Sequence, residues 1–231
     1  MTLALDETRP RRPVLSRLAA IPATVGFGFL WLGLMAVCAL FADLIRPYDI
    51  TQMDLMARLA PPGTPRHWLG TDELGRDVLS RLIQSIRVSL VIAFGATILS
   101  ALFGTTLGFL AAQFRGWVEH LVVMLADFQA ALPFLIMSLA VLAFFGSSMW
   151  LLVCLMGFYG WERYARIARG LAISAGAQGY AAAVVQLGAT PSRVYLRHIL
   201  PNVASPLLVQ ASIALGTALI VEASLSYLGL G

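Results

Sequence analysis

The chain has 231 residues, of which 59% are hydrophobic and only 12% carry a charge. A soluble domain has roughly 25% charged residues, so most of this chain must be surrounded by lipid. In hydrocarbon every backbone N–H and C=O group has to find a partner inside the chain, which makes the long apolar runs helices and not open strands. The predicted fold class is therefore an all-α integral membrane protein.

The charged residues exclude several functions. All 16 cationic residues are arginines. A nucleotide-binding P-loop needs a lysine, so this chain cannot hydrolyse ATP by that route. The histidines and cysteines lack the spacing of metal ligands, and the arginines flank apolar runs without interleaved aromatic residues. We therefore expect no metal site, no nucleic-acid partner and no enzymatic activity, with lipid headgroups as the anionic neighbours.

The N-terminal part predicts a membrane anchor. Residues 1–22 carry four arginines against two acids, and an uncharged run follows from Ala23 to Ala42. By the positive-inside rule, 1–22 is a cytoplasmic N-terminal segment and 23–45 is the first transmembrane helix. The run is longer than that of a signal peptide and ends in the polar residues Asp43 and Arg46, so a retained anchor is favoured over a cleaved signal.

Residues 46–87 are polar and hold six arginines and five acids, which predicts a periplasmic segment because the charges nearly cancel. It contains a predicted amphipathic helix. Thr71 is the expected N-cap, and Asp72 and Glu73 suit the first turn. The apolar face consists of Val78, Leu79, Leu82, Ile83 and Ile86.

Residues 88–231 contain the remaining apolar runs. Val88 to Gln113 is long enough to span the bilayer, and small residues recur at every fourth position within it: Ala96, Ser100, Gly104, Gly108 and Ala112. Such a row, with the G-x-x-x-G pair Gly104 and Gly108, lets another helix pack closely. Val118 to Tyr159 is divided at Gly146–Ser148 into an outgoing and a returning helix, and Ala204 to Leu228 is a further run. The prediction is five spans.

Residues 162–202 hold five arginines and one acid, which predicts a cytoplasmic segment. Tyr180 to Leu187 is expected to form a short helix that Gly188 ends. Thr190 and Pro191 then begin a second, basic helix that stops at Leu200-Pro201. An interfacial helix lying on anionic lipid explains these features equally well.

Four stretches resemble one family. Tyr180–Ala189 with Arg197–Asn202 resembles the EAA loop of ABC importer permeases. His67–Leu82 resembles the periplasmic signature of the dipeptide, oligopeptide and nickel permeases. Asp127 with Pro133, and Glu222–Gly231, resemble their third and fifth spans. The resemblance runs from about Ile45 to the last residue. It implies a type I ABC importer permease bundle, with residues 88–231 as the permease core.

The resemblance also implies roles for particular residues. The ATPase-coupling loop would comprise Tyr180, Ala182, Ala183, Gly188, Ala189, Arg193, Arg197, His198, Leu200 and Pro201. The signature, Gly70, Thr71, Asp72, Gly75, Arg76 and Asp77, would meet a periplasmic solute-binding protein. Two departures stand out: Ala182 replaces the acid that names the motif, and Val184 replaces its second alanine. The family's sixth span is also missing.

Asp127 and Glu222 are ionisable residues at membrane depth, which makes them candidates for the translocation path. The alternative is a buried carboxylate satisfied by a neighbouring helix or held neutral. Our hypothesis for Asp127 is that it holds helices together and does not bind substrate.

The predicted function follows from the resemblance. The chain would be a permease subunit in the bacterial inner membrane that translocates small peptides, or nickel as a chelate. It would pair with a second permease, two ATPase subunits or domains and a solute-binding protein. It would carry no cofactor, since ATP and Mg²⁺ belong to the ATPases. The alternatives are an ion-coupled secondary transporter and a membrane scaffold.

Overall fold

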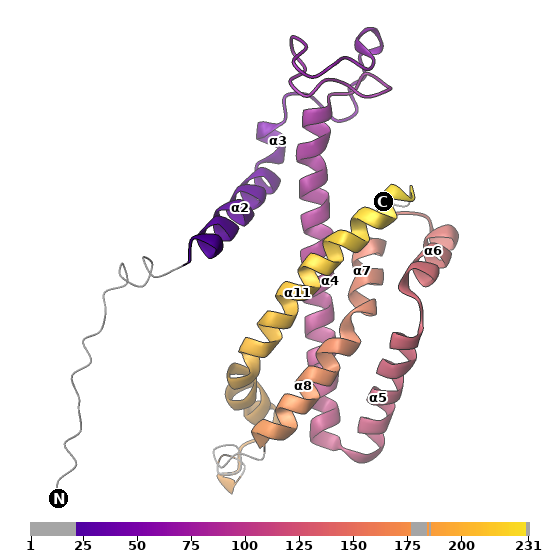
Figure 1. Ribbon diagram of the computed structural model, residues 1–231. Coiled ribbons are helices and arrows are strands. Elements are labelled where there is room, and N and C mark those ends of the chain that lie inside the picture. The colour runs from indigo at the N-terminus through magenta and orange to yellow at the C-terminus, as the bar shows by residue number, and fades with distance from the viewer. Residues whose placement is uncertain (1–21, 177–183, 185, 230–231) are drawn as a thin grey trace, which may run out of the picture. The chain divides into compact units, whose positions relative to one another are not determined.

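The computed structural model describes residues 22–176, 184 and 186–229 (Figure 1). All regular elements within these residues are helices, and the only pairings of β type among them are the isolated bridges Thr64–His67 and Thr71–Asp77. The all-α prediction is therefore confirmed. The chain divides into two compact units at Arg87/Val88, inside helix α4, and each unit is described by itself.

Three helical stretches of the described residues are long and apolar enough to cross a membrane: α2 (Ala23–Leu40), α4 (Val78–Phe114) and the continuous stretch Pro191–Tyr227. A fourth is obtained if α5 (Gly116–Ala131) and α6 (Phe134–Phe145) count as one bent span. Helix α7 (Met149–Tyr159) has 11 residues, whereas a span takes about 20. The count of five spans remains a prediction.

The first unit contains α2, α3 (Ala42–Ile45), the single 3-10 turn η1 (Leu55–Ala57) and the start of α4. Helix α2 is apolar all round and has no buried residue, as expected where the surrounding medium is lipid. Arg87 on α4 donates a 2.6 Å hydrogen bond to Asp43 on α3. This ion pair connects the two ends of the polar segment.

The predicted N-cap of the amphipathic helix is wrong. Helix α4 begins at Val78, and Asp77 caps it by accepting 2.8 Å hydrogen bonds from the N–H and the hydroxyl of Ser80. Residues 71–76 form a turn in which Gly75 has a φ of +74°. The carboxylate of Asp77, with Ser80 three residues later, is a better cap than Thr71. The predicted amphipathic helix and the predicted span are therefore one helix of 37 residues.

The predicted outgoing helix contains a break that was not predicted from the sequence. Helices α5 and α6 meet at Leu132–Pro133 with a bend of 85°. Proline has no N–H to donate and disfavours a helical conformation in the residue before it. The Tyr159 hydroxyl donates to the Leu132 carbonyl at 3.4 Å. The predicted break at Gly146–Ser148 is confirmed, since α6 ends at Phe145 and Ser148 caps α7.

The row of small residues on α4 is the packing face of the second unit. All five members are buried. The Ser100 hydroxyl donates to the Gly157 carbonyl at 2.6 Å, and a Cβ placed on Gly108 would lie 2.5 Å from the Ala165 carbonyl. A Cβ on Gly104 would overlap the Trp161 carbonyl. Thus α8 (Trp161–Gly176) contacts α4 backbone to backbone, as the spacing predicts, and α7 contacts α4 through the Ser100 hydroxyl; α8 also packs against α5 and α11 (Figure 1).

The second predicted cytoplasmic helix begins as expected but does not stop at Leu200-Pro201. The chain stays helical through α10 (Pro191–Arg193), the π-helix η2 (Val194–Ile199) and α11 (Leu200–Tyr227). The Leu200 N–H bonds to the Tyr195 carbonyl, five residues earlier. A proline ring clashes with the carbonyl four residues before it, here that of Arg197, and the wider π turn makes room for the ring.

Candidate functional site

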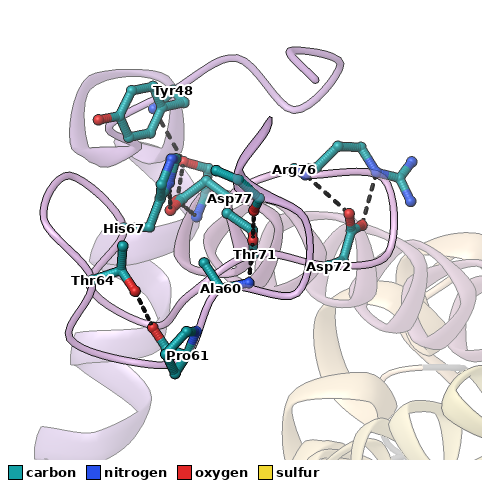
Figure 2. Close-up of polar contacts among 11 residues, drawn as sticks. Tyr48, Ala60, Pro61, Thr64, His67, Thr71, Asp72, Arg76 and Asp77 are labelled. Atoms are coloured by element: carbon teal, nitrogen blue, oxygen red, sulfur yellow. Dashed lines mark hydrogen bonds and ion pairs between the residues drawn. The ribbon is translucent and has the colours of Figure 1, made fainter. Parts of the chain in front are cut away.

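The six predicted signature residues lie within residues 70–77 of the first unit, and Figure 2 shows Thr71, Asp72, Arg76 and Asp77 among them. The Asp72 carboxylate accepts 2.9 Å hydrogen bonds from the N–H groups of Leu74 and Arg76, and the Arg76 guanidinium donates to it at 2.8 Å. Arg81 also donates to this carboxylate. The backbone donors outline an Asx-type turn, so Asp72 serves the fold of the loop itself.

Asp77 is the buried centre of the same loop. Its side chain is 2% exposed and lies 3.0 Å from Nδ1 of His67. The Tyr48 ring packs on His67 with centroids 5.0 Å apart, and the Tyr48 N–H donates to the Ser80 hydroxyl at 3.1 Å. His67 begins the signature stretch, but neither it nor Tyr48 was among the predicted site residues, because their contacts depend on how the loop folds back on itself and on α4.

The other signature residues keep residues 70–75 in close contact with residues 54–60 of the same loop. The Thr71 hydroxyl accepts from the Ala60 N–H at 2.9 Å and donates to the Ala57 carbonyl. Gly70 has a φ of +77°, and a Cβ on it would overlap the Ala60 carbonyl. A Cβ on Gly75 would likewise overlap the backbone of Asp54. These glycines are needed for conformation and for close approach.

The end of the predicted first coupling helix has the expected geometry. Gly188 has a φ of +80°, and the Ala189 N–H donates to the Val184 carbonyl at 3.3 Å. This is the six-to-one bond of a Schellman motif, which commonly ends helices at glycine. Tyr180, Ala182 and Ala183 lie outside the described residues.

The helix that follows has a buried face and an exposed face. Val194, Ile199 and Val203 are buried against Phe109 and Ala112 of α4 and three alanines of α8: Ala168, Ala172 and Ala175. On the other side Arg193, Leu196 and Arg197 are exposed, and so is Leu187 in the preceding turn. His198 and Leu200 are half-buried, and Pro201 is exposed. We call Leu187, Arg193, Leu196 and Arg197 the exposed coupling face.

The two candidate carboxylates are placed differently. Asp127 on α5 forms a 2.8 Å ion pair with Arg166 on α8, and a second ion pair, Glu119–Arg169, joins the same helices. Glu222 on α11 is 7% exposed and accepts hydrogen bonds from Ser89 at 2.8 Å and Ser226 at 2.9 Å. Asp127 thus connects α5 with α8, and Glu222 connects α11 with α4, which favours the helix-holding alternative. In the part of the chain that the structure describes, no cluster of three metal-ligating side chains occurs.

Comparison with known sequences decides the family. The family described as binding-protein-dependent transport system inner membrane component matches residues 104–231. The chain belongs to this family. The N-terminal transmembrane domain of oligopeptide transport permease C matches residues 24–62. The permease resemblance of the sequence is thereby confirmed, and the apolar helices are those of a multi-pass inner membrane protein.

Several curated permeases are similar over most of the chain. A glutathione transport system permease protein of Pectobacterium atrosepticum is 33% identical over 198 residues, 86% of this chain and 66% of the relative. A dipeptide transport system permease protein of Alkalihalophilus pseudofirmus is 32% identical over 193 residues, covering 84% and 63%. A di/tripeptide transport system permease protein of Pseudomonas aeruginosa is 35% identical over 209 residues, covering 88% and 69%. The chain thus spans about two thirds of the length of these relatives.

The carboxylate of Asp72 gives this permease a testable pH dependence. Partial burial raises its pKa, but the hydrogen bonds from Arg76, Leu74 and Arg81 outweigh that effect and lower the pKa from 3.8 to about 2. A lowered folded-state pKa means that the ionised carboxylate stabilises the turn above pH 3.8, and this contribution is lost as the pH falls towards 2.

In Asp72→Asn we expect faster amide hydrogen exchange across residues 70–77 at pH 7. After correction for the intrinsic exchange rate, the difference from the natural chain should shrink below pH 3.8. An equal rate at pH 7 would contradict the role of this carboxylate.

The Asp127–Arg166 pair predicts a variant of the permease with intact uptake. Both side chains are about half exposed, and ion pairs of this kind contribute about 0–1 kcal/mol. We expect Asp127→Asn to lower the free energy of unfolding by no more than about 1 kcal/mol and to leave solute uptake unchanged. Uptake assays in intact cells measure the second effect. Loss of uptake with normal assembly would overturn the assignment of Asp127 as a helix-holding residue.

Proposed function

We propose that this chain is a translocation subunit of an ATP-driven importer of small peptides. The observation that carries the proposal is the helix after Gly188. One face of it packs on α4 and α8, and the other presents Arg193, Leu196 and Arg197, with Leu187 exposed in the preceding turn. An apolar and basic face on a firmly packed helix suits the docking of a partner protein. In this family of inner membrane components the natural partner is an ATPase, which supplies ATP and Mg²⁺.

The packing also provides a route for coupling. Val194, Ile199 and Val203 are buried against the C-terminal turns of α4 and against α8, and Phe109 contacts Tyr195 with ring centroids 5.2 Å apart. Close-packed interiors transmit displacement because they have few voids to absorb it. When the ATPases close on ATP, movement of the exposed coupling face would therefore shift α4 and α8 together and change access to the translocation path.

The segment that lacks the motif's acid at Ala182 carries two exposed basic side chains, which can form a different charge contact with the ATPase. Arg193 and Arg197 are exposed on either side of Leu196. Guanidinium groups pair well with carboxylates. We propose that the ATPase presents acidic side chains to these two arginines and an apolar pocket to Leu196.

The substrate proposal comes from the relatives. The three permeases compared above are named for glutathione, dipeptides and di/tripeptides. All of these are short peptides, so we propose that this chain carries a short peptide. No observation favours a nickel chelate. An ion-coupled carrier is also disfavoured, because Glu222 is held by two hydroxyl groups and Asp127 by Arg166.

We propose that the solute-binding protein binds to the loop formed by residues 46–77. Its turn is held by Asp72 and Asp77, and large apolar side chains are exposed around it, among them Trp68 at 77% exposure. By the positive-inside rule this loop is periplasmic and the N-terminus is cytoplasmic. A second permease subunit and two ATPase subunits would complete the complex.

Copurification tests the proposal. The tagged chain is extracted from its native membrane in mild detergent, and the proteins that accompany it are identified by mass spectrometry. We expect a second permease and an ATPase, with ATP hydrolysis in the purified complex. A chain that is folded and recovered in good yield without any ATPase would contradict the proposal.

A further inference from the structure

The helix after Gly188 contains an irregular turn, the π-helix η2, between two stretches of α-helix. At its start the Val194 N–H bonds to the Thr190 carbonyl, four residues earlier, at 3.1 Å. At its end the Leu200 N–H bonds to the Tyr195 carbonyl, five residues earlier. The π turn therefore holds one residue more than a turn of α-helix. Since an α-helix turns by about 100° per residue, the extra residue changes the direction in which the preceding segment points relative to α11.

The buried side chains of this segment show what the extra residue does. Val194, Ile199 and Val203 are 5%, 2% and 4% exposed and belong to one apolar cluster with α4 and α8. Ile199 and Val203 are four residues apart, which places them on one face of an α-helix. Val194 and Ile199 are five residues apart, which places them on one face only where the hydrogen bonds also join residues five apart. The π turn thus brings Val194 onto the buried face.

The exposed coupling face depends on the same turn. With Val194 buried, this face points away from the apolar cluster. In an uninterrupted α-helix Tyr195 would lie four residues before Ile199 and would take the buried place of Val194. Residues 191–194 would then turn by about 100° relative to α11. Tyr195 is half-buried beside Phe109, so this second arrangement also has an apolar side chain to bury. We call the observed arrangement the π register and the uninterrupted one the α register.

Pro201 favours the π register. In an α-helix its ring would clash with the Arg197 carbonyl, which disfavours the α register by about a hundredfold. A proline alone does not produce a π turn, because Pro206 lies inside the α-helix α11. At Pro201 the clash and the packing of the apolar cluster act in the same direction. The Asn202 side-chain amide also donates to the His198 carbonyl at 2.7 Å, which gives a carbonyl of the turn a partner.

We propose that the π turn sets the direction of the exposed coupling face relative to α4 and α8, and that Pro201 is the positioning residue that holds it. The inference rests on the proposed function and adds the element that orients its docking surface. In the π register, force that an ATPase applies to the exposed coupling face reaches α4 and α8 through Val194. In the α register the ATPase still binds, but the force acts in another direction and ATP is hydrolysed without transport.

The reactivity of a thiol at position 194 measures the register directly. Cys38 and Cys154, the two cysteines of the chain, are replaced by alanine, and Val194→Cys then places a thiol at a buried position. In the full chain we expect this thiol to react slowly with a water-soluble maleimide, because reaction requires access. Adding Pro201→Ala should make the reaction at least about tenfold faster. Arg193→Cys, at an exposed position, should react rapidly with and without Pro201→Ala.

A deletion separates the register from the mere loss of a proline. Deleting His198 in the Pro201→Ala chain leaves Val194 and Ile199 four residues apart, so an uninterrupted α-helix again buries both. The thiol at position 194 should then react as slowly as with Pro201 in place. The matched control is Pro206→Ala, which makes the same substitution in the same helix outside the π turn and should leave the reaction slow.

Transport is measured on the complete importer, reconstituted in liposomes with its solute-binding protein, as peptide taken up per ATP hydrolysed. In Pro201→Ala we expect the ATPase to remain bound and uptake per ATP to fall at least about tenfold, because the α register is no longer disfavoured. Deleting His198 in addition should restore uptake per ATP. Pro206→Ala should match the natural chain.

Each contrary result has a definite meaning. Slow reaction at position 194 in Pro201→Ala would overturn the role of Pro201, and so would loss of the bound ATPase. A deletion variant no better than Pro201→Ala would indicate local unfolding and would overturn the register. If these failures occur in an importer that takes up peptide with ATP, only this inference is wrong. If no ATPase assembles with the natural chain, the importer assignment is wrong and the inference falls with it.

Discussion

Gly108→Val is expected to disrupt the second unit more than any other single substitution considered for this chain. A Cβ at this position would lie 2.5 Å from the Ala165 carbonyl and 2.9 Å from the Ala168 Cβ. The obstacle is backbone, which cannot turn away as a flexible side chain can. Overpacking typically costs about 1–3 kcal/mol, and we expect a loss near the upper end, about 3 kcal/mol in the free energy of unfolding. Titration of the purified chain with a denaturing detergent, followed by tryptophan fluorescence, measures the change.

A matched control is available on α11. Gly216 is a helical glycine with no atom within 4 Å of a Cβ placed on it. Gly216→Ala should leave stability unchanged or raise it by up to about 1 kcal/mol, because alanine is the better helix former. If Gly108→Val were as stable as this control, α4 and α8 would not be in backbone contact.

The double substitution Leu196→Asp with Arg197→Glu is expected to abolish ATP-driven uptake without unfolding the chain. Both side chains are exposed, and neither belongs to the cluster formed by Val194, Ile199 and Val203. Like charges facing a partner cost several kcal/mol, so we expect ATPase binding to fall by at least about a hundredfold. The ATPase retained by the tagged permease, measured at several salt concentrations, reports the effect.

Leu196→Met is the control for this variant, because it keeps an apolar side chain of similar volume in the same exposed position. It should retain ATPase binding and uptake. If the doubly charged variant also retained the ATPase, the exposed coupling face would not be the docking surface, and an interfacial helix on lipid would become the better interpretation.

Local rules in the sequence predicted the features that depend on a single element. Small residues at every fourth position of α4 indicated its packing face, and Gly188 indicated the end of a helix. Both signals lie within one helix, where the period of 3.6 residues or the left-handed region of glycine decides the outcome.

Features that depend on competition or on tertiary contacts were missed. Thr71 was predicted as the cap, but the turn around Asp72 places the start of α4 after Asp77, which caps the helix instead. Pro133 was noted without the 85° bend it produces, and Pro201 did not end its helix because a π turn precedes it. The contacts His67–Asp77 and Glu222–Ser89, at separations of 10 and 133 residues, arise from tertiary folding, so no pattern within one element predicts them.

The central claim is that ATP, and not an ion gradient, drives transport through this chain. The purified complex is reconstituted in liposomes with its solute-binding protein, and uptake of a labelled dipeptide is measured with and without ATP in the presence of a proton ionophore. The account predicts uptake that requires ATP and is unaffected by the ionophore. Uptake that proceeds without ATP and collapses with the ionophore would contradict it.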